Sequence, residues 1–376
     1  METIKDSDWP GKKENAKAAA QIPAQALSPR LAEVARLFRT KPFFPHRLAR
    51  GGHAQTLVAG LKGKVNTRLN DEIRGSEART FEVAPGASLL AHCRWQSERR
   101  AAPTLVLVHG LEGSSRSHYM RGTARKAFTA GLNVVGVNLR NCGDSEHLTE
   151  TLYHSGMSGD IRRVVEELAE HDGLRTIFVA GFSMGGNIVL KLAGEYGERP
   201  PESLAGVCAV SPSLDLSACA DRLEQRENRI YMSSFLHSLH RRIRRKQRRH
   251  PNIYDARGLR SVRTIREFDE RFTAPHAGFR DAADYYAQSS ALPLVARIRV
   301  PTLILHAADD PLIPASSFLD PSLALNPEVL LVMPPRGGHV AFIADAASGG
   351  EDRFWAENRV VEFCRLLAGA LPAEGA

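Results

Sequence analysis

The chain has 376 residues, of which 43% are hydrophobic, so it is long enough to bury a sizeable core and too long for a mini-protein held by disulfides. The net charge is +8, and much of the excess lies in one run, from Arg241 to Arg249. The five cysteines are scattered and form no C-x-x-C pair, which argues against a zinc site or a redox pair and favours reduced thiols.

Residues 1–28 mix charges with Lys, Ala, Gln and Pro without a hydrophobic period, and they predict a disordered leader. This segment has no apolar stretch of the length of a signal peptide. No window in the chain reaches the ~18 uninterrupted apolar residues that are typical of a spanning helix. We therefore expect a soluble, cytoplasmic protein in which residues 29–376 form a single domain.

The first elements are predicted between this leader and residue 95. A short helix is predicted from Pro29 to Leu37, because its apolar residues share one face. A segment rich in Pro, Phe and His follows at 41–53, and an antiparallel region is expected at 65–95.

From Thr104 onward, short continuous apolar runs alternate with helical patterns. Apolar runs that do not alternate with polar residues are typical of strands buried on both faces. The predicted strands are 104–108, 133–137, 176–180, 206–210, 302–305 and 329–332. The predicted helices are 119–130, 160–170, 186–196 and 353–367. This alternation predicts an α/β fold with a mainly parallel sheet that is covered on both faces.

A long gap separates the fourth of these strands from the fifth. Roughly ninety residues pass there with helical patterning and no core-like strand. A stretch of this length inside a compact domain is expected to be structured. We predict a helical cap insertion over the active site, at about 213–295.

Residues 181–185 read GFSMG and match the pattern G-x-S-x-G. The pattern alone is weak, but here a buried strand leads into it and a helix leads out, as in the nucleophile turn of serine hydrolases. The sharp turn forces the serine into a strained backbone conformation, for which the flanking glycines leave room. The sequence therefore predicts Ser183 as a nucleophile; the alternative is an ordinary glycine-rich turn.

A serine nucleophile needs a base, and the base needs an acid that fixes its tautomer. Asp309 and Asp310 follow the predicted strand 302–305, and His339 follows the last strand, in the order serine, acid, histidine. Asp310 is favoured as the acid because a proline follows it after three intervening residues, a common spacing in such hydrolases. Asp309 stays open as an alternative, and His339 has the alternative of a polar loop histidine.

An oxyanion hole needs two backbone N–H groups aimed at the developing charge. One is expected from Met184, the residue after the nucleophile, and the other from Leu111, where Gly110 lets the backbone approach closely. His109 precedes this turn and is expected to support it. His306 fits the role of the base less well, because it sits at a predicted strand.

Several segments together resemble the YheT-like branch of the α/β-hydrolases, which is related to the ABHD esterases and lipases. The resemblance is carried by GHAQTL at 52–57, HGLEGSS at 109–115 with SHY at 117–119, GFSMGGN at 181–187, FDERFTAP at 268–275 with GF at 278–279, and GGH at 337–339. It runs from about residue 42 to the end and implies ester hydrolysis on acyl chains of varied length. Some relatives are acyltransferases or phospholipid hydrolases. We expect the FDERFTAP segment to order the cap beside the site.

Two features depart from the pattern of this family. Relatives commonly have glycine where this chain has Asn141, in the sequence NLRNCG at 138–143. Asn tolerates a left-handed backbone better than other non-glycine residues, so the turn is expected to survive. Eukaryotic relatives often carry an N-terminal membrane helix, and none is expected here.

The predicted function is a serine hydrolase that cleaves small-molecule or lipid carboxylic esters through Ser183, Asp310 and His339, without a metal or an organic cofactor. An acyltransferase that passes the acyl group to an alcohol or thiol is the alternative. A more distant alternative is an inactive protein that binds anions or nucleic acid.

The basic run from Arg241 to Arg249 has two interpretations. It contains seven Lys and Arg residues, which would favour transient contact with an anionic membrane surface. It is also compatible with a solvated helix face or a mobile part of the cap. No nucleic-acid-binding motif accompanies the run, so no specific nucleic acid is expected as a partner.

Overall fold

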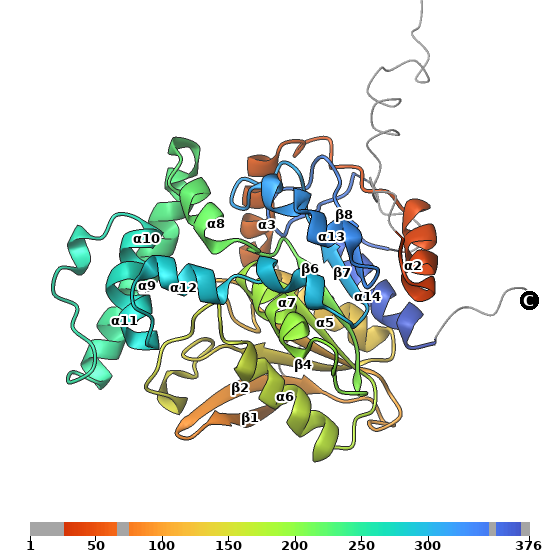
Figure 1. Cartoon of the computed structure of the whole chain (residues 1–376), viewed down its shortest axis with the longest axis horizontal. Coiled ribbons are helices and arrows are strands. Elements are labelled where there is room, and N and C mark those ends of the chain that lie inside the picture. The colour runs from red at the N-terminus through yellow and green to blue at the C-terminus, as the bar shows by residue number, and fades with distance from the viewer. Residues whose placement is uncertain (1–25, 66–74, 346–350, 370–376) are drawn as a thin grey trace, which may run out of the picture.

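The structure is a computed structural model that describes residues 26–65, 75–345 and 351–369. Most of the predicted leader, 1–28, lies outside these residues. One eight-stranded sheet with helices on both faces forms the centre of the molecule (Figure 1). The predicted α/β fold is confirmed.

The sheet is mainly parallel. Its order is β1-β2-β4-β3-β5-β6-β7-β8, with β1 and β2 antiparallel at one edge and parallel pairing from β4 to β8. The strands are β1 (Glu77–Ala84), β2 (Ala87–Arg94), β3 (Thr104–Val108), β4 (Asn133–Asn138), β5 (Ile177–Phe182), β6 (Leu204–Val210), β7 (Thr302–Leu305) and β8 (Val329–Val332). Strands β3 to β8 follow the six predicted runs, because strands buried on both faces are apolar throughout.

Alternate residues of the central strands enter two separate cores, one on each face of the sheet. In β3, Val106 and Val108 belong to one core, whereas Leu105 and Leu107 belong to the other. The helices over the first face are α6 (Ser158–Glu170) and α7 (Met184–Tyr196), and those over the second are α2 (Pro29–Arg39), α5 (His118–Thr129) and α14 (Trp355–Leu367).

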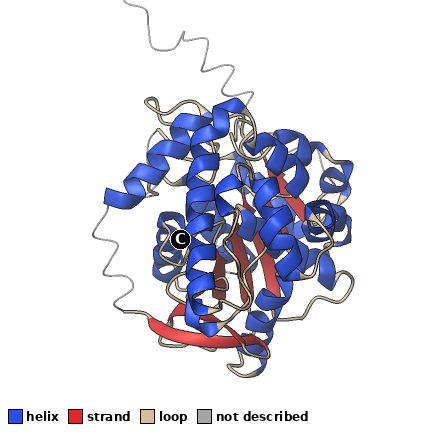
Figure 2. Cartoon of the chain, turned by 90° about the vertical axis from the view of Figure 1, so that its left-hand side faces the viewer, coloured by secondary structure: helices blue, strands red, loops and turns tan. Residues whose placement is uncertain are grey.

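The connection between β6 and β7, residues 211–301, is helical and lies to one side of the sheet (Figure 1). Viewed from that side, its helices stand in front of the strands (Figure 2). Its main helices are α8 (Leu216–Leu223), α9 (Arg229–Arg249), α10 (Ile265–Phe268), α11 (Ala274–Ala277) and α12 (Ala282–Ser289), with a π-helical turn at Asp269–Thr273. We call this segment the β6–β7 connection. The limits of the cap within it, 213–295, and the assignment of 29–376 to a single domain stay predictions.

The prediction of an antiparallel region at 65–95 is wrong at the N-terminal end of that range. Val65 is the last residue of a helix, α3 (Gly52–Val65), and the β1–β2 hairpin begins at Glu77. Residues 66–74 lie outside the described residues. The sequence did not indicate α3 because Gly60 and Gly63 disfavour a helix. A further short helix, α13 (Pro321–Leu325), precedes β8.

The basic run forms the C-terminal end of α9 and is a solvated helix face only in part, because two of its residues are buried. Arg242 and Lys246 lie one turn apart and are buried. The Lys246 ammonium donates to the Thr149 carbonyl oxygen at 2.6 Å. The exposed basic residues are Arg241, Arg244, Arg248 and Arg249.

No helix within the described ranges combines the length and the apolar character that a bilayer crossing requires.

Candidate active site

Three polar side chains meet at the carboxyl ends of parallel strands. Ser183 follows β5, Asp310 follows β7 and His339 follows β8. The His339 Nε2 atom lies 2.9 Å from Ser183 Oγ, and the His339 Nδ1 atom lies 2.8 Å from Asp310 Oδ2. With the ring proton on Nδ1, toward the carboxylate, Nε2 is free to accept the hydroxyl proton of the serine. The structure thus brings these predicted residues into one chain of hydrogen bonds.

The backbone of Ser183 is held in an unusual conformation, with φ +56° and ψ −121°. Two glycines make this turn possible. A Cβ atom on Gly181 would lie 2.1 Å from the Gly185 carbonyl oxygen, and one on Gly185 would lie 2.4 Å from the Val108 carbonyl oxygen. Any side chain at these two positions would displace backbone atoms, so the glycines fix the sharp turn that presents Ser183.

The two neighbouring aspartates have different surroundings. Asp310 is buried, and its Oδ1 atom accepts from the N–H groups two and three residues further on, at 2.8 and 3.1 Å. Burial alone would raise the pKa of Asp310, but attraction to His339 and the hydrogen bond between them hold that pKa below its ordinary value. Asp309 instead accepts from the Gly338 N–H group at 2.9 Å. Asp310 therefore orients the His339 ring, whereas Asp309 supports the loop that carries it.

Two other histidines lie near the site. His306 is buried and stacks on Phe318 with the ring centroids 3.7 Å apart, and its Nδ1 atom lies 4.0 Å from Asp310 Oδ2. Burial lowers the pKa of His306 to about 4, and it does the same for His109. The His109 Nε2 atom accepts from the Leu139 N–H group at 3.1 Å, which ties the turn after β3 to the turn after β4.

The two N–H groups expected to form the oxyanion hole lie in segments that adjoin the serine. Met184 is the first residue of α7, where N–H groups have no acceptor within the helix. Leu111 lies in a four-residue turn that is closed by a hydrogen bond of 3.0 Å from the Gly113 N–H group to the Gly110 carbonyl oxygen. A Cβ atom on Gly110 would lie 3.0 Å from the Ser183 Cβ atom, so glycine permits this close approach.

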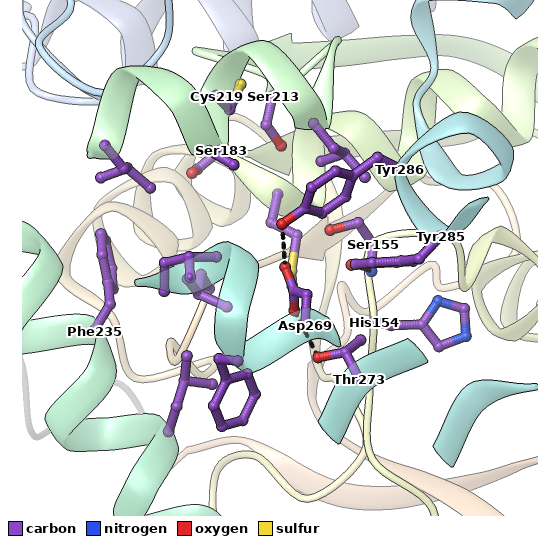
Figure 3. Close-up of a pocket in the computed structure, with 18 of the residues that line it drawn as sticks. His154, Ser155, Ser183, Ser213, Cys219, Phe235, Asp269, Thr273, Tyr285 and Tyr286 are labelled. Carbon is purple, nitrogen blue, oxygen red and sulfur yellow. Dashed lines mark hydrogen bonds between the residues drawn. The ribbon is translucent and has the colours of Figure 1, made fainter. Parts of the chain in front are cut away.

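The wall of a mainly apolar pocket contains Ser183, which is labelled in Figure 3, and it also contains His339. Much of the wall comes from the β6–β7 connection. Its apolar residues include Leu216, Leu223, Phe235, Leu239, Ile265 and Phe268. An acyl chain bound here would be removed from water, which is favourable by about 0.8 kcal/mol for each buried methylene group.

A polar cluster interrupts this apolar wall. The Asp269 carboxylate accepts from the Thr273 hydroxyl at 2.6 Å and from the Tyr286 hydroxyl at 2.8 Å (Figure 3). Burial raises the pKa of Asp269 to about 6. Asp269 and Thr273 belong to the FDERFTAP segment, for which the sequence suggested no chemical role. The segment forms a π-helical turn, and both residues line the pocket.

The side chains that could hold a metal ion are those of Cys, His, Asp and Glu. All five cysteines are free and buried. Among the described residues, no group of three or more His, Cys, Asp or Glu side chains is arranged to hold a metal ion.

A parallel sheet with a serine on a strained strand-to-helix turn, hydrogen-bonded to histidine and aspartate, defines an α/β-hydrolase. The chain matches the α/β hydrolase fold family over residues 103–346, and it belongs to that family. It is 35% identical to "Putative esterase YheT" of Escherichia coli, over 69% of this chain and 76% of that protein. It is 30% identical to monoacylglycerol lipase of Saccharomyces cerevisiae, over 73% of this chain and 62% of the lipase.

The solved structure of the Pyrococcus furiosus esterase Pf2001 has the same fold. It aligns with a TM-score of 0.53 over 80% of this chain and 94% of the esterase, at 17% identity. The resemblance to the YheT-like α/β-hydrolases is confirmed by the family match and by the 35% identity to the YheT esterase. The names of these relatives agree with the expected enzyme class, carboxylic ester hydrolase.

Proposed function

We propose that this chain hydrolyses carboxylic esters, with Ser183 as the nucleophile, His339 as the general base and Asp310 as the residue that orients His339. The observation that carries this proposal is the unbroken chain of hydrogen bonds from Asp310 through His339 to Ser183, in the wall of a mainly apolar pocket. Two relatives that are named as an esterase and a monoacylglycerol lipase support esters as the substrate class.

The reaction would proceed in two stages. First, His339 Nε2 takes the hydroxyl proton while Ser183 Oγ attacks the ester carbonyl carbon, and the N–H groups of Leu111 and Met184 stabilise the oxyanion. His339 then protonates the departing alcohol, which leaves the acyl group on Ser183. In the second stage, His339 removes a proton from water, and the resulting attack releases the acid and restores the serine.

We also propose that the protein encounters lipid esters at a membrane surface. The exposed basic residues at the end of α9 would attract the protein transiently to anionic membrane surfaces, at about 1 kcal/mol for each basic residue near the surface. The cytoplasmic location expected from the sequence stays a prediction.

The test is a panel of p-nitrophenyl esters with short to long acyl chains, assayed with the wild type and with Ser183→Ala. We expect Ser183→Ala to lower kcat by at least about 10³-fold, because the acyl-enzyme is no longer formed, while its circular dichroism and thermal midpoint stay unchanged. Substantial turnover by this variant would place the nucleophile elsewhere. The same assay with added alcohol separates hydrolysis from acyl transfer, since transfer yields a new ester.

A further inference from the structure

Glu112 has an unusual backbone conformation beside the proposed oxyanion hole. Its φ is +55°, in the left-handed region, which costs a non-glycine residue roughly 1–2 kcal/mol. Glu112 and Leu111 are the two central residues of the turn that the Gly113 N–H group and the Gly110 carbonyl close. A turn with a positive φ at its third residue normally has glycine or asparagine there. The turn that carries the Leu111 N–H group therefore lasts only while Glu112 is held in this conformation.

Two side chains hold Glu112. The Tyr153 hydroxyl accepts from the Glu112 N–H group at 2.9 Å and donates to Glu112 Oε1 at 2.8 Å. The Arg242 Nε atom donates to the same carboxylate oxygen at 2.7 Å. The ion pair is well shielded from water, because the two side chains are only 6% and 11% exposed. Removing one partner of such a buried pair would leave the other charge uncompensated.

The same guanidinium group also holds a second turn. Arg242 Nη1 donates to the Asn141 carbonyl oxygen at 2.6 Å, and Arg242 Nη2 lies 3.4 Å from Cys142 Sγ. Asn141 has φ +63°, so it adopts the left-handed conformation that the sequence led us to expect. One arginine thus braces two left-handed residues on the adjacent turns after β3 and β4. A planar group with donors in a fixed fork suits this double contact better than a lysine ammonium would.

We propose that Arg242 is a positioning residue for the oxyanion hole. Through its ion pair it keeps Glu112 in the left-handed conformation and thereby keeps the Leu111 N–H group aimed at the reacting carbonyl oxygen. Arg242 belongs to α9, so the oxyanion hole is complete only while this helix of the β6–β7 connection is docked on the turns after β3 and β4. The inference rests on the proposed function, since an oxyanion forms only if Ser183 attacks an ester.

The test compares Arg242→Met and Arg242→Lys with Arg229→Met, an exposed residue of the same helix outside the basic run, as the matched control. The readouts are kcat and KM for p-nitrophenyl butyrate and the affinity for a trifluoromethyl ketone of similar size. This ketone forms a tetrahedral adduct with the serine, so its oxygen occupies the oxyanion hole. Loss of a single oxyanion donor typically lowers kcat by about 10²–10³-fold.

We expect Arg242→Met to lower kcat by about 10–100-fold, because the donor would be displaced and not removed. The affinity for the ketone should fall by a similar factor, while KM changes by less than about threefold. Arg242→Lys should recover part of the loss, and Arg229→Met should match the wild type. A purely structural role would lower the thermal midpoint without this selective loss of ketone affinity. The assays are therefore run well below the midpoint of each variant.

A double-variant cycle with Glu112→Gln sharpens the test. If Arg242 acts through Glu112, Arg242→Met combined with Glu112→Gln should lose no more kcat than the worse single variant. Additive losses, or an Arg242→Met variant with wild-type kcat and ketone affinity, would overturn the inference while leaving the proposed function intact. A wild type without Ser183-dependent turnover would overturn both.

Discussion

The sheet and the β6–β7 connection contribute different kinds of residue to the candidate active site. Ser183, Asp310 and His339 stand on turns at the ends of strands that are buried on both faces, so the packed sheet fixes their positions. The connection contributes apolar wall residues, the Asp269 cluster and Arg242. The sheet therefore supplies the groups proposed to react, and the helices supply much of the pocket wall and the contacts of Arg242 with the turns after β3 and β4.

We expect the largest effect on kcat from a substitution among the residues that follow the strands of the sheet. Asp310→Asn should lower kcat by about 10³–10⁴-fold, because an amide no longer fixes the tautomer of His339 or stabilises its protonated form. Asp309→Asn is the matched control, since it alters the neighbouring side chain, which bonds to the Gly338 N–H group; we expect less than a tenfold loss. Steady-state kinetics on one p-nitrophenyl ester measure both. The opposite ranking would assign the role of the acid to Asp309.

Within the β6–β7 connection, we expect the largest effect on the free energy of unfolding, through Asp269. The pKa of Asp269 is raised from 3.8 to about 6 in the folded protein, so the folded state binds this proton more tightly than the unfolded chain does. The resulting stabilisation is full below about pH 4 and is lost as the pH rises through 6. The free energy of unfolding of the wild type, relative to Asp269→Asn, should therefore fall by up to about 3 kcal/mol between pH 4 and pH 7.

Urea unfolding at several pH values measures this difference, and Asp320→Asn serves as a control of opposite sign. The hydrogen bonds that Ser322 gives to Asp320 lower its pKa, so its contribution is present at neutral pH and is lost as the pH falls through that lowered pKa. Parallel pH profiles for the wild type and Asp269→Asn would contradict the burial argument for Asp269.

The exposed face of α9 should show the smallest effect. Replacing Arg244 and Arg248 by Gln should weaken binding to phosphatidylserine-containing vesicles by about tenfold to thirtyfold, since each basic residue contributes on the order of 1 kcal/mol. Hydrolysis of a soluble ester should not change. Co-sedimentation with vesicles that contain phosphatidylserine or lack it measures the binding. Equal binding by wild type and variant would remove the membrane surface as a partner.

The sequence predicted the parts of the molecule that depend on local pattern. Continuous apolar runs gave the positions of β3 to β8, and the glycines around Ser183 indicated the sharp turn. The helix α3 escaped prediction because Gly60 and Gly63 disfavour a helix. No local pattern indicates that its first residue approaches a distant loop, where a Cβ atom on Gly52 would lie 1.9 Å from the Asp309 carbonyl oxygen.

The contacts of the basic run could not be predicted in the same way. Arg242 and Glu112 are 130 positions apart, and no local pattern links them. Charge counting assigned Arg242 to the surface, whereas a long-range ion pair holds it inside the molecule. The spacing to a proline favoured Asp310 over Asp309 but could not show which carboxylate meets the histidine; the structure has Asp310 Oδ2 at 2.8 Å from His339 Nδ1.

The most direct test of the central claim is to label the protein with a fluorophosphonate and to map the adduct by peptide mass spectrometry while following ester hydrolysis. We predict a single adduct on Ser183, a loss of hydrolysis in proportion to labelling, and no adduct in Ser183→Ala. Continued hydrolysis by fully labelled protein, or an adduct on another residue, would contradict the assignment of Ser183 as the nucleophile.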